Sequence, residues 1–357
     1  MSTLLALARP EIVALQPYQH AAWKPTLERL HANEMPWPPP GDNATSGLNY
    51  YPEPQPKALL ERLASLYGVH REQVLVGRGS DEGIDLLIRA FCRAGQDRIL
   101  ICPPTYSMYK VTANIQGAST VEVPLAPQTF ALNRAAIVSA WREGTKLIFL
   151  CSPNNPTGNL LDASEICALC AALDGKALVV VDEAYIEFAR ADSLAKQLDR
   201  YPNLVVLRTL SKAYALAGAR CGAVLAHPEV IGLLARIIQP YAMPKPTIAA
   251  ALQFTAPDAL AELRQRIAII HAERARLTDE LSKLPLIRRV YPSDANFLLL
   301  DCADAERVLN AAVNVGLIIR DQRSQKALPH GVRISIGSPE QNARLLNGLR
   351  QAAGAEA

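Results

Sequence analysis

The sequence predicts an α/β protein: a large domain with a mainly parallel, mixed sheet flanked by helices, followed by a smaller α+β domain. Three apolar segments, Leu147–Leu150, Ala177–Val181 and Asn203–Arg208, alternate with helix-like stretches. Continuous apolar runs of this kind are typical of strands buried on both faces, as in a parallel sheet covered by helices. The alternation of strands with helices favours βαβ units. After about Pro257 the pattern changes, which indicates a second domain.

The chain begins with a segment that we expect to be an arm rather than a domain. Residues 1–40 are irregular in pattern and rich in proline toward their end. Pro52, Pro54 and Pro56 extend this segment into a stiff, exposed loop, because proline fixes its own backbone and restricts its neighbour. The elements expected next are a helix at Lys57–Tyr67, a strand at Val74–Val76, a helix at Glu82–Cys92 and a strand at Arg98–Cys102.

A long helix is predicted to open the second domain. Ala259–Leu284 carries an apolar stripe with charged residues between its members. The elements expected after it are a strand at Asn296–Leu300, a helix at Ala303–Val315, strands at Leu317–Arg320 and Val332–Ile336, and a helix from Pro339. The chain therefore divides into an arm (residues 1–40), a large domain (41–256) and a small C-terminal domain (257–357).

Composition excludes several classes of protein. The 357 residues exceed one typical domain, and half of them are hydrophobic, which suffices for a sizeable core. With 37 basic and 34 acidic residues the net charge is +3, and the basic residues are scattered, so we expect no nucleic-acid surface. No apolar stretch is long enough to cross a membrane. The N-terminus lacks a basic region before its apolar residues, so we expect no secretory signal.

The cysteines favour a reducing compartment. Seven is an odd number, and they are spread without a disulfide framework, which indicates a cytoplasmic protein. Cys167 and Cys170 form one Cys-x-x-Cys pair inside the expected helix Ala163–Leu173, with no second pair to complete a metal site. The histidines are isolated from one another. We therefore expect no metal.

A polar cluster follows each of the three buried strands. Asn154–Gly158 follows the first, Asp182–Tyr185 the second, and Thr209–Arg220, which contains Lys212, the third. The carboxyl ends of parallel strands meet at one sheet edge, where α/β enzymes bind their ligands. A lysine amine held in such a pocket forms a Schiff base with a carbonyl compound. Lysine, carboxylate and amide together are the set that pyridoxal phosphate requires.

These motifs resemble those of the fold-type-I aminotransferases that use pyridoxal phosphate, and among them the histidinol-phosphate aminotransferase family. The resemblance runs from about Asn33 to Asn342. The segments that carry it are Asn33-Glu34, Tyr50–Pro56, Gly77–Gly83, Cys102–Tyr109, Asn154–Gly158, Asp182–Tyr185, Thr209–Arg220 and Arg333–Gly337. The chain departs from the pattern at Ala21-Ala22-Trp23, where the resemblance leads us to expect a more basic stretch.

The resemblance implies a phosphate site at the start of the helix after Gly79. There the backbone amides of Ser80 and Asp81 would hold the cofactor phosphate, because a helix N-terminus attracts anions. By itself the segment also fits a simple turn with Ser80 as the helix N-cap. The other residues implied at this phosphate are Thr209, Ser211, Arg220 and, from the neighbouring subunit of a homodimer, Tyr51.

The resemblance also assigns residues around the pyridine ring. Tyr106 would stack on the ring, and Asn155 and Tyr185 would hydrogen-bond to its O3′ oxygen. Asp182 would pair with the ring nitrogen and keep it protonated, so that the ring accepts electrons. Lys212, Asp182 and Tyr185 are the implied catalytic residues. Glu183 is expected to serve structure.

For the substrate, the resemblance implies a second set of residues. Arg333 and Arg320 match arginines on the substrate side, and guanidinium groups bind both phosphate and carboxylate. Asn33 and Glu34 match an Asn-Glu pair near the substrate. The expected reaction converts L-histidinol phosphate and 2-oxoglutarate to imidazole acetol phosphate and L-glutamate, a step of histidine biosynthesis.

Two other readings stay open at this point. One is another enzyme with overlapping motifs, either an aromatic amino-acid aminotransferase or a decarboxylase of a phosphorylated amino acid. The other is a ligand sensor without catalysis, although the sequence shows no helix-turn-helix or basic cluster that would bind DNA. We expect small-molecule substrates, a homodimer with shared sites, and neither a nucleic-acid nor a membrane partner. The arm of residues 1–40 is expected to pack with the small domain or with the dimer partner.

Overall fold

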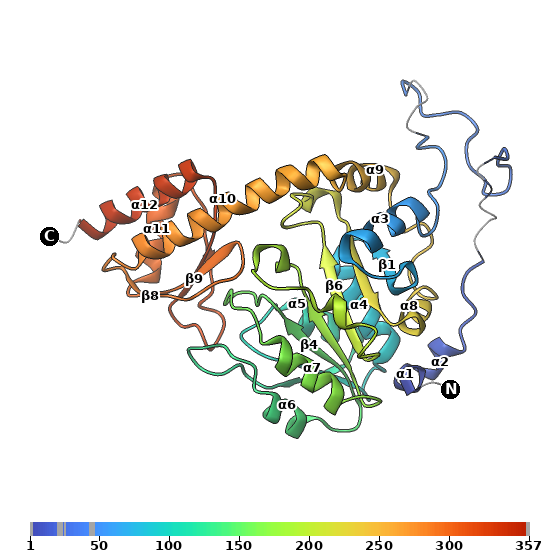
Figure 1. Ribbon diagram of the computed structural model, residues 1–357, viewed down its shortest axis with the longest axis horizontal. Helices are drawn as coiled ribbons and strands as arrows, with labels where there is room; N and C mark the ends of the chain where they lie inside the picture. Colours follow the sequence, from blue (N-terminus) through green and yellow to red (C-terminus); the bar gives the residue numbers. More distant parts are fainter. Residues whose placement is uncertain (1–2, 20–23, 25, 43–46, 355–357) are drawn as a thin grey trace.

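Two bodies of unequal size are joined by a long helix in the computed structural model, which describes residues 3–19, 24, 26–42 and 47–354 (Figure 1). The departure at Ala21-Ala22-Trp23 lies outside the described residues. The larger body contains a mixed sheet with helices on both faces, and the smaller one contains an antiparallel sheet with helices on one face. The predicted α/β class with a second α+β domain is confirmed.

The large sheet is mainly parallel. In the described part of the chain its strands are β1 (Val74–Gly77), β2 (Arg98–Ile101), β3 (Ser119–Glu122), β4 (Thr145–Cys151), β5 (Leu178–Asp182), β6 (Leu204–Thr209) and β7 (Gly222–Ala226). They lie in the order β1-β7-β6-β5-β4-β2-β3. Neighbours from β6 to β3 run parallel, whereas β7 runs antiparallel to both β6 and β1. The parallel strands β4, β5 and β6 therefore end at the same sheet edge.

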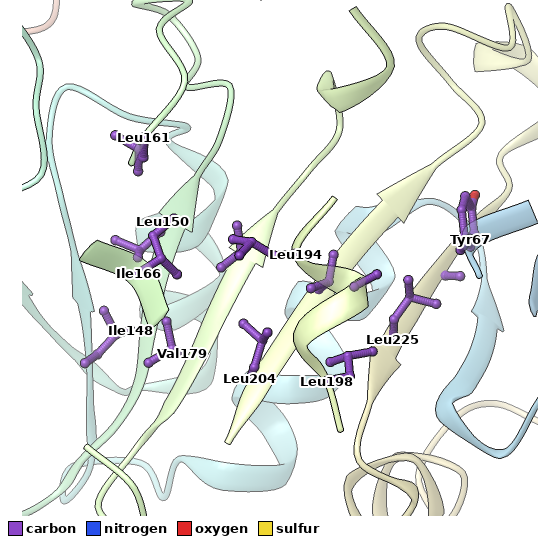
Figure 2. Packing of buried hydrophobic residues seen from close by; sticks show 14 of the residues in the cluster. Tyr67, Ile148, Leu150, Leu161, Ile166, Val179, Leu194, Leu198, Leu204 and Leu225 are labelled. Atoms are coloured by element: carbon purple, nitrogen blue, oxygen red, sulfur yellow. The ribbon is translucent and has the colours of Figure 1, made fainter. Parts of the chain in front are cut away.

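Each central strand is buried on both faces, as its apolar run predicts. In β4, Ile148 and Leu150 enter one core, while Leu147 and Phe149 enter the other. Figure 2 shows the first core, where Ile148 and Leu150 lie near Ile166. Because successive side chains of a strand point to opposite faces, a run without polar residues requires cover on both.

Helices supply that cover. The first core is closed by α3 (Lys57–Tyr67), α6 (Arg134–Ala140), α7 (Ala163–Ala172) and α9 (Lys245–Phe254). The second core is closed by α4 (Ser80–Phe91), α5 (Met108–Gln116) and α8 (Pro228–Leu234). The expected helices α3, α4 and α7 are confirmed to within two residues at each end.

The small body is an antiparallel sheet with helices on one face. Its strands are β8 (Ile287–Val290), β9 (Phe297–Cys302), β10 (Arg320–Asp321) and β11 (Gly331–Ser335), in the order β10-β11-β9-β8. Its helices are α10 (Pro257–Leu281), α11 (Ala305–Asn314) and α12 (Pro339–Gly354). Leu298 and Leu300 of β9 pack toward these helices, and Phe297 and Leu299 pack toward the large body. The face of this sheet that its own helices do not cover therefore packs against the large domain.

The strand predicted at Leu317–Arg320 is wrong in its bounds. Only Arg320 and Asp321 pair with β11. The amide of Leu317 donates to the Ala312 carbonyl and closes the end of α11, so it is not available to a ladder. Leu317 and Ile319 pack against the small-domain core instead.

The N-terminal segment has two short helices that the sequence analysis did not predict. They are α1 (Thr3–Leu7) and α2 (Pro10–Val13). Leu4 and Leu7 enter the core that α8 closes, and the Arg9 guanidinium donates to the Arg89 carbonyl. Contacts of the described start of the arm are thus with the large body of its own chain. Farther along, the described parts of the segment up to α3 run outside the body (Figure 1).

Candidate functional site

The ends of β4, β5 and β6 bring three segments with polar side chains to the same edge of the sheet. These strands end at Cys151, Asp182 and Thr209, and the segments that hold Asn155, Tyr185 and Lys212 follow directly. The Lys212 Nζ lies 5.5 Å from the centre of the Tyr185 ring. The Lys212 side chain is exposed, as an amine that must meet a small molecule requires. The predicted convergence at this edge is therefore present in the structure.

Asp182, the last residue of β5, is a buried carboxylate at this edge of the sheet. It is 3% exposed, and its two oxygens accept one hydrogen bond each, from the Tyr109 hydroxyl at 2.9 Å and from the Ala184 amide at 3.1 Å. Burial raises the pKa of Asp182 to about 6, against the opposing effect of these hydrogen bonds and of Lys212. A cationic group beside Asp182 would relieve this cost of burial.

Tyr185 connects the large domain to the small one. The Asn155 amide donates to the Tyr185 hydroxyl at 3.3 Å, and the Arg333 guanidinium donates to the Asn155 oxygen. The Tyr185 ring meets the edge of the Phe297 ring, with centroids 5.1 Å apart. Burial raises the pKa of Tyr185, so its hydroxyl stays neutral near physiological pH.

Two arginines face each other at the edge of the small sheet. Arg320 and Arg333 are direct partners in the β10–β11 ladder, so their side chains share one face. Like charges in directly opposite positions destabilise a sheet. Burial and then Arg320 lower the pKa of Arg333, and the buried Arg333 Nε has no hydrogen-bond partner among the described residues. An anionic ligand would satisfy both groups.

A third group of residues lies at the N-terminus of α4. The Arg220 guanidinium contacts Ser211 Oγ at 3.4 Å and Asp81 Oδ2 at 3.5 Å, and Thr209 Oγ1 donates to Ser211 Oγ at 2.9 Å. The Tyr106 hydroxyl donates to Asp81 Oδ1 at 3.1 Å. A basic side chain, hydroxyls and a helix N-terminus together suit a phosphate.

Two glycines allow this close packing. Gly79, and not Ser80, is the N-cap of α4, and its φ of 88° suits a residue without a Cβ. A Cβ on Gly79 would come within 3.0 Å of Arg220 Nη2, and one on Gly222 within 2.7 Å of the Gly79 backbone. Ser80 is the first residue of the helix, so the alternative interpretation of Ser80 as a simple N-cap does not hold.

A buried ion-pair network lies next to the segment that holds Lys212. Arg208, at the end of β6, contacts Glu187 Oε1 at 2.5 Å and Glu183 Oε2 at 3.4 Å, and its guanidinium lies 4.5 Å from the centre of the Tyr67 ring. Glu183 also accepts hydrogen bonds from Ser193 Oγ and the Leu194 amide. The expectation that Glu183 serves structure agrees with these contacts.

Glu34 and Tyr51 form a separate group on the N-terminal segment, and Asn33 directly precedes Glu34. The Glu34 carboxylate accepts from the Arg29 guanidinium at 2.6 Å and from the Tyr51 amide at 2.7 Å, and its side chain is only 3% exposed. The Tyr51 ring stacks on Tyr241 at 4.5 Å between centroids and stays half exposed. In this chain Glu34 thus holds the segment together, and the substrate role of Asn33 and Glu34 stays a prediction.

Two residues at the site, Tyr109 and Asn154, have no role among those expected from the sequence. Tyr109 bonds Asp182, and the buried Asn154 holds its own loop by donating to the Pro104 carbonyl and the Thr157 hydroxyl. The sequence carries no signal for Tyr109, because its contact with Asp182 depends on where α5 packs on the sheet. No signal within the sequence identified the partner of Asn154.

Neither a metal-binding cluster nor a membrane-spanning helix occurs within the described ranges. No group of His, Cys, Asp or Glu residues there has the arrangement of a metal site, and each cysteine is free. Among the same residues, none of the helices combines the length and the apolar character that crossing a bilayer requires.

Known proteins resemble this chain over most of its length. The family model for aminotransferase class I and II matches residues 18–349. The histidinol-phosphate aminotransferase of Stenotrophomonas maltophilia is 47% identical over 351 residues, which cover 97% of this chain and 96% of that protein. The enzyme of the same name from Xylella fastidiosa (strain 9a5c) is 47% identical over 90% of this chain and 88% of its own.

Solved structures agree with the sequence comparison. The histidinol-phosphate aminotransferase of Sinorhizobium meliloti, crystallised in complex with pyridoxal 5′-phosphate, superposes with a TM-score of 0.79. That match covers 88% of this chain and 85% of the other, at 27% identity.

Proposed function

Because the chain belongs to aminotransferase class I and II, we propose that it transfers the amino group of L-histidinol phosphate to 2-oxoglutarate. The products are imidazole acetol phosphate and L-glutamate. The observation that carries this proposal is the convergence of Lys212, Asp182 and Tyr185 at one sheet edge, opposite the facing arginines Arg320 and Arg333. The named relatives support histidinol phosphate as the amino donor.

Pyridoxal phosphate is the cofactor, and the residues at the site fit it. Asp182 is a buried carboxylate without a cation in hydrogen-bonding contact among the described residues, so a protonated pyridine nitrogen would complete its pairing. Ser80, Asp81, Thr209, Ser211 and Arg220 would hold the phosphate, and Tyr106 would lie against the ring. When bound, the cofactor supplies an aldehyde for the lysine amine and a ring that withdraws electrons from the substrate.

Lys212 and Tyr185 would have different roles near the substrate, the first as a base and the second as a hydrogen-bond donor. The Lys212 amine, once free, takes the proton from the substrate Cα as a general base. The Tyr185 hydroxyl and the Asn155 amide donate hydrogen bonds that orient the reacting groups, and Asn155 is itself held by Arg333. This contact links the substrate-side arginine to the ring-side amide.

Arg320 and Arg333 would bind the substrate anion. Histidinol phosphate carries a phosphate but no carboxylate, whereas glutamate carries two carboxylates. Guanidinium groups form paired hydrogen bonds with either kind of anion. Two observations support an anion between the arginines. Arg333 Nε has no hydrogen-bond partner among the described residues, and the two positive charges lie directly opposite each other in the sheet.

We further propose that the active enzyme is a cytoplasmic homodimer. Large apolar side chains are exposed along the described N-terminal segment, among them Leu27, Leu30, Met35, Trp37, Leu48 and Tyr51. Such a concentration favours cover by another chain. In this arrangement Tyr51 reaches the cofactor phosphate of the neighbouring subunit, and the free cysteines agree with a reducing compartment.

The proposal is tested by comparing amino donors. Steady-state kinetics with 2-oxoglutarate as acceptor should give a kcat/KM for L-histidinol phosphate that exceeds that for phenylalanine by about a hundredfold or more, because only the former donor offers a phosphate to the arginines. Phenylalanine at equal or higher kcat/KM would indicate an aromatic aminotransferase. Release of CO₂ from a phosphorylated amino acid would indicate a decarboxylase.

A further inference from the structure

Tyr109 is a fully buried tyrosine in the second position of α5. Its ring stacks on Phe149 of β4, with centroids 4.9 Å apart and planes inclined by 14°. The edge of the Tyr106 ring meets it at 5.6 Å and 84°. Packing from two sides fixes the ring, and thereby the direction in which its hydroxyl points.

The hydroxyl points at Asp182. It donates to Oδ2 at 2.9 Å, while the Ala184 amide donates to Oδ1 at 3.1 Å, so each carboxylate oxygen has one donor from a different element. The amide comes from the segment after β5, which no side-chain substitution removes. Tyr109 thus provides the side-chain half of the support for Asp182.

Other charged and titratable groups surround this carboxylate. Lys212 favours its ionised form, whereas Asp81 opposes it. The hydroxyl or thiol groups that also face it, and that burial keeps neutral, belong to Tyr106, Tyr109, Cys151 and Tyr185. Burial is the largest influence on Asp182 and favours the neutral acid, so each donor that favours the carboxylate matters.

We infer that Tyr109 is a positioning residue, whose hydroxyl holds Asp182 in the ionised form that pairs with the cofactor ring. This inference rests on the proposed role of Asp182 toward pyridoxal phosphate. A neutral Asp182 is a weaker partner for a cationic ring nitrogen. Tyr109 thus acts through Asp182 and extends the site into the core between α5 and β4.

The hydroxyl can be separated from the packing of the ring. Tyr109→Phe keeps the stack on Phe149 and the edge contact with Tyr106 and removes only the donor. Tyr67→Phe is the matched control, because the Tyr67 hydroxyl is also buried but has no hydrogen-bond partner among the described residues. Each of the two variants therefore loses one buried tyrosine hydroxyl, and only one of them touches Asp182.

The measurement is the dissociation constant of pyridoxal phosphate from the apo-protein as a function of pH. Binding should weaken as pH falls and Asp182 takes up a proton, which gives the profile an acid limb. In Tyr109→Phe this limb should move upward by about one pH unit, because a hydrogen bond to a charged group changes its proton affinity by about that amount. At a pH within the limb, binding should then be up to about tenfold weaker than in the parent.

Four further variants complete the test. The cofactor's own titrations are common to all proteins, so Tyr67→Phe should show the parent profile. Asp182→Asn should lose the acid limb that Asp182 causes, and adding Tyr109→Phe to it should cause no further shift. Replacing Tyr109 by 3-fluorotyrosine keeps the ring and makes the hydroxyl a stronger donor, so the limb should move to lower pH.

The outcomes separate the inference from the function on which it rests. An unchanged limb in Tyr109→Phe, or an equal shift in Tyr67→Phe, overturns the role of Tyr109 while Asp182→Asn still changes the profile. A parent-like profile in Asp182→Asn overturns the proposed role of Asp182, and the inference with it. If the acid limb of the 3-fluorotyrosine variant stays in place or moves to higher pH, the inference is contradicted. This outcome decides the question even where Tyr109→Phe does not fold.

Discussion

Burial of the Asp182 carboxylate lowers the stability of the cofactor-free protein, and pairing with the cofactor's ring nitrogen would offset this cost. Burial raises the pKa of its carboxyl to about 6, above the ordinary value that it has in an unfolded chain. A carboxyl with a raised folded pKa stabilises the fold fully only below its unfolded pKa, and this contribution is lost as pH rises through the folded pKa. Asp182 therefore contributes least to the free energy of unfolding of the apo-protein above about pH 6.

Asp182→Asn should accordingly stabilise the apo-protein at pH 8 by about 3 kcal/mol and leave it nearly unchanged near pH 4. The amide stays neutral at both values, and the Tyr109 hydroxyl can turn to accept from it. Urea unfolding of the two apo-proteins at both pH values measures this difference. A variant that is less stable at pH 8 would show that Asp182 is not strained by burial.

At the scale of residues, the sequence identified the groups that follow strand ends and missed those that support them. Asp182, Asn155 and Lys212 were placed together because parallel strands end at a common edge. Tyr109 is reached only when the position of α5 on the sheet is known. The contacts of Glu34 with Arg29 and Tyr51 likewise depend on how an irregular segment folds back, which no periodicity encodes.

The segment after β6 owes its position to the strand that precedes it. Arg208 is 6% exposed and bonds Glu183, Glu187 and the Ser193 hydroxyl, all of them outside β6. Four residues later the chain presents Lys212. The buried network thereby anchors the element that carries the lysine.

Removing the cation should leave two buried carboxylates without their partner. Arg208→Met should therefore lower the free energy of unfolding by about 3–5 kcal/mol. Lys196→Ala is the control: it breaks an ion pair with Asp192 at the surface, and should change stability by less than about 0.5 kcal/mol. Urea midpoints of the apo-proteins compare the two. Equal, small losses would mean that the Arg208 network does not stabilise the fold.

At the scale of elements, strongly apolar or periodic segments were predictable, and short mixed ones were not. The strands β4, β5 and β6 and the helix α10 follow from their patterns. Gly222–Ala226 forms β7 although glycine and alanine disfavour strands, because it is enclosed between β6 and β1. The edge strand β3, exposed at Ser119 and Glu122, has no apolar pattern and forms by pairing with β2.

At the scale of the whole molecule, the N-terminal segment carries exposed apolar side chains that the proposed dimer would cover. Beyond α2, the described parts of that segment up to α3 run along the outside of the body (Figure 1). Tyr51, in this part of the chain, is half exposed. The proposed dimer would place Tyr51 of each subunit at the site that contains Lys212 of the other. The sequence could suggest this only through its resemblance to known enzymes, because an interface between chains leaves no periodic pattern.

Subunit mixing tests the shared site. Preparations of Tyr51→Ala and of Lys212→Ala should each be impaired, and mixing them under conditions that exchange subunits should raise activity above both. One site of each heterodimer then carries both changes, and the other carries neither. If Tyr51 serves its own subunit, every mixed site stays defective. Activity that does not rise on mixing, with exchange verified by mass spectrometry, contradicts the shared site.

In the proposed function, Lys212 is the residue that holds the cofactor. Protein saturated with pyridoxal phosphate, reduced with sodium borohydride and digested should yield one peptide that carries the cofactor's mass, since reduction fixes the carbon–nitrogen bond between lysine and aldehyde. We expect fragmentation to place the label on Lys212 and expect Lys212→Ala to carry none. A label on another lysine at the same occupancy, or an unlabelled Lys212 in an active preparation, would contradict the account.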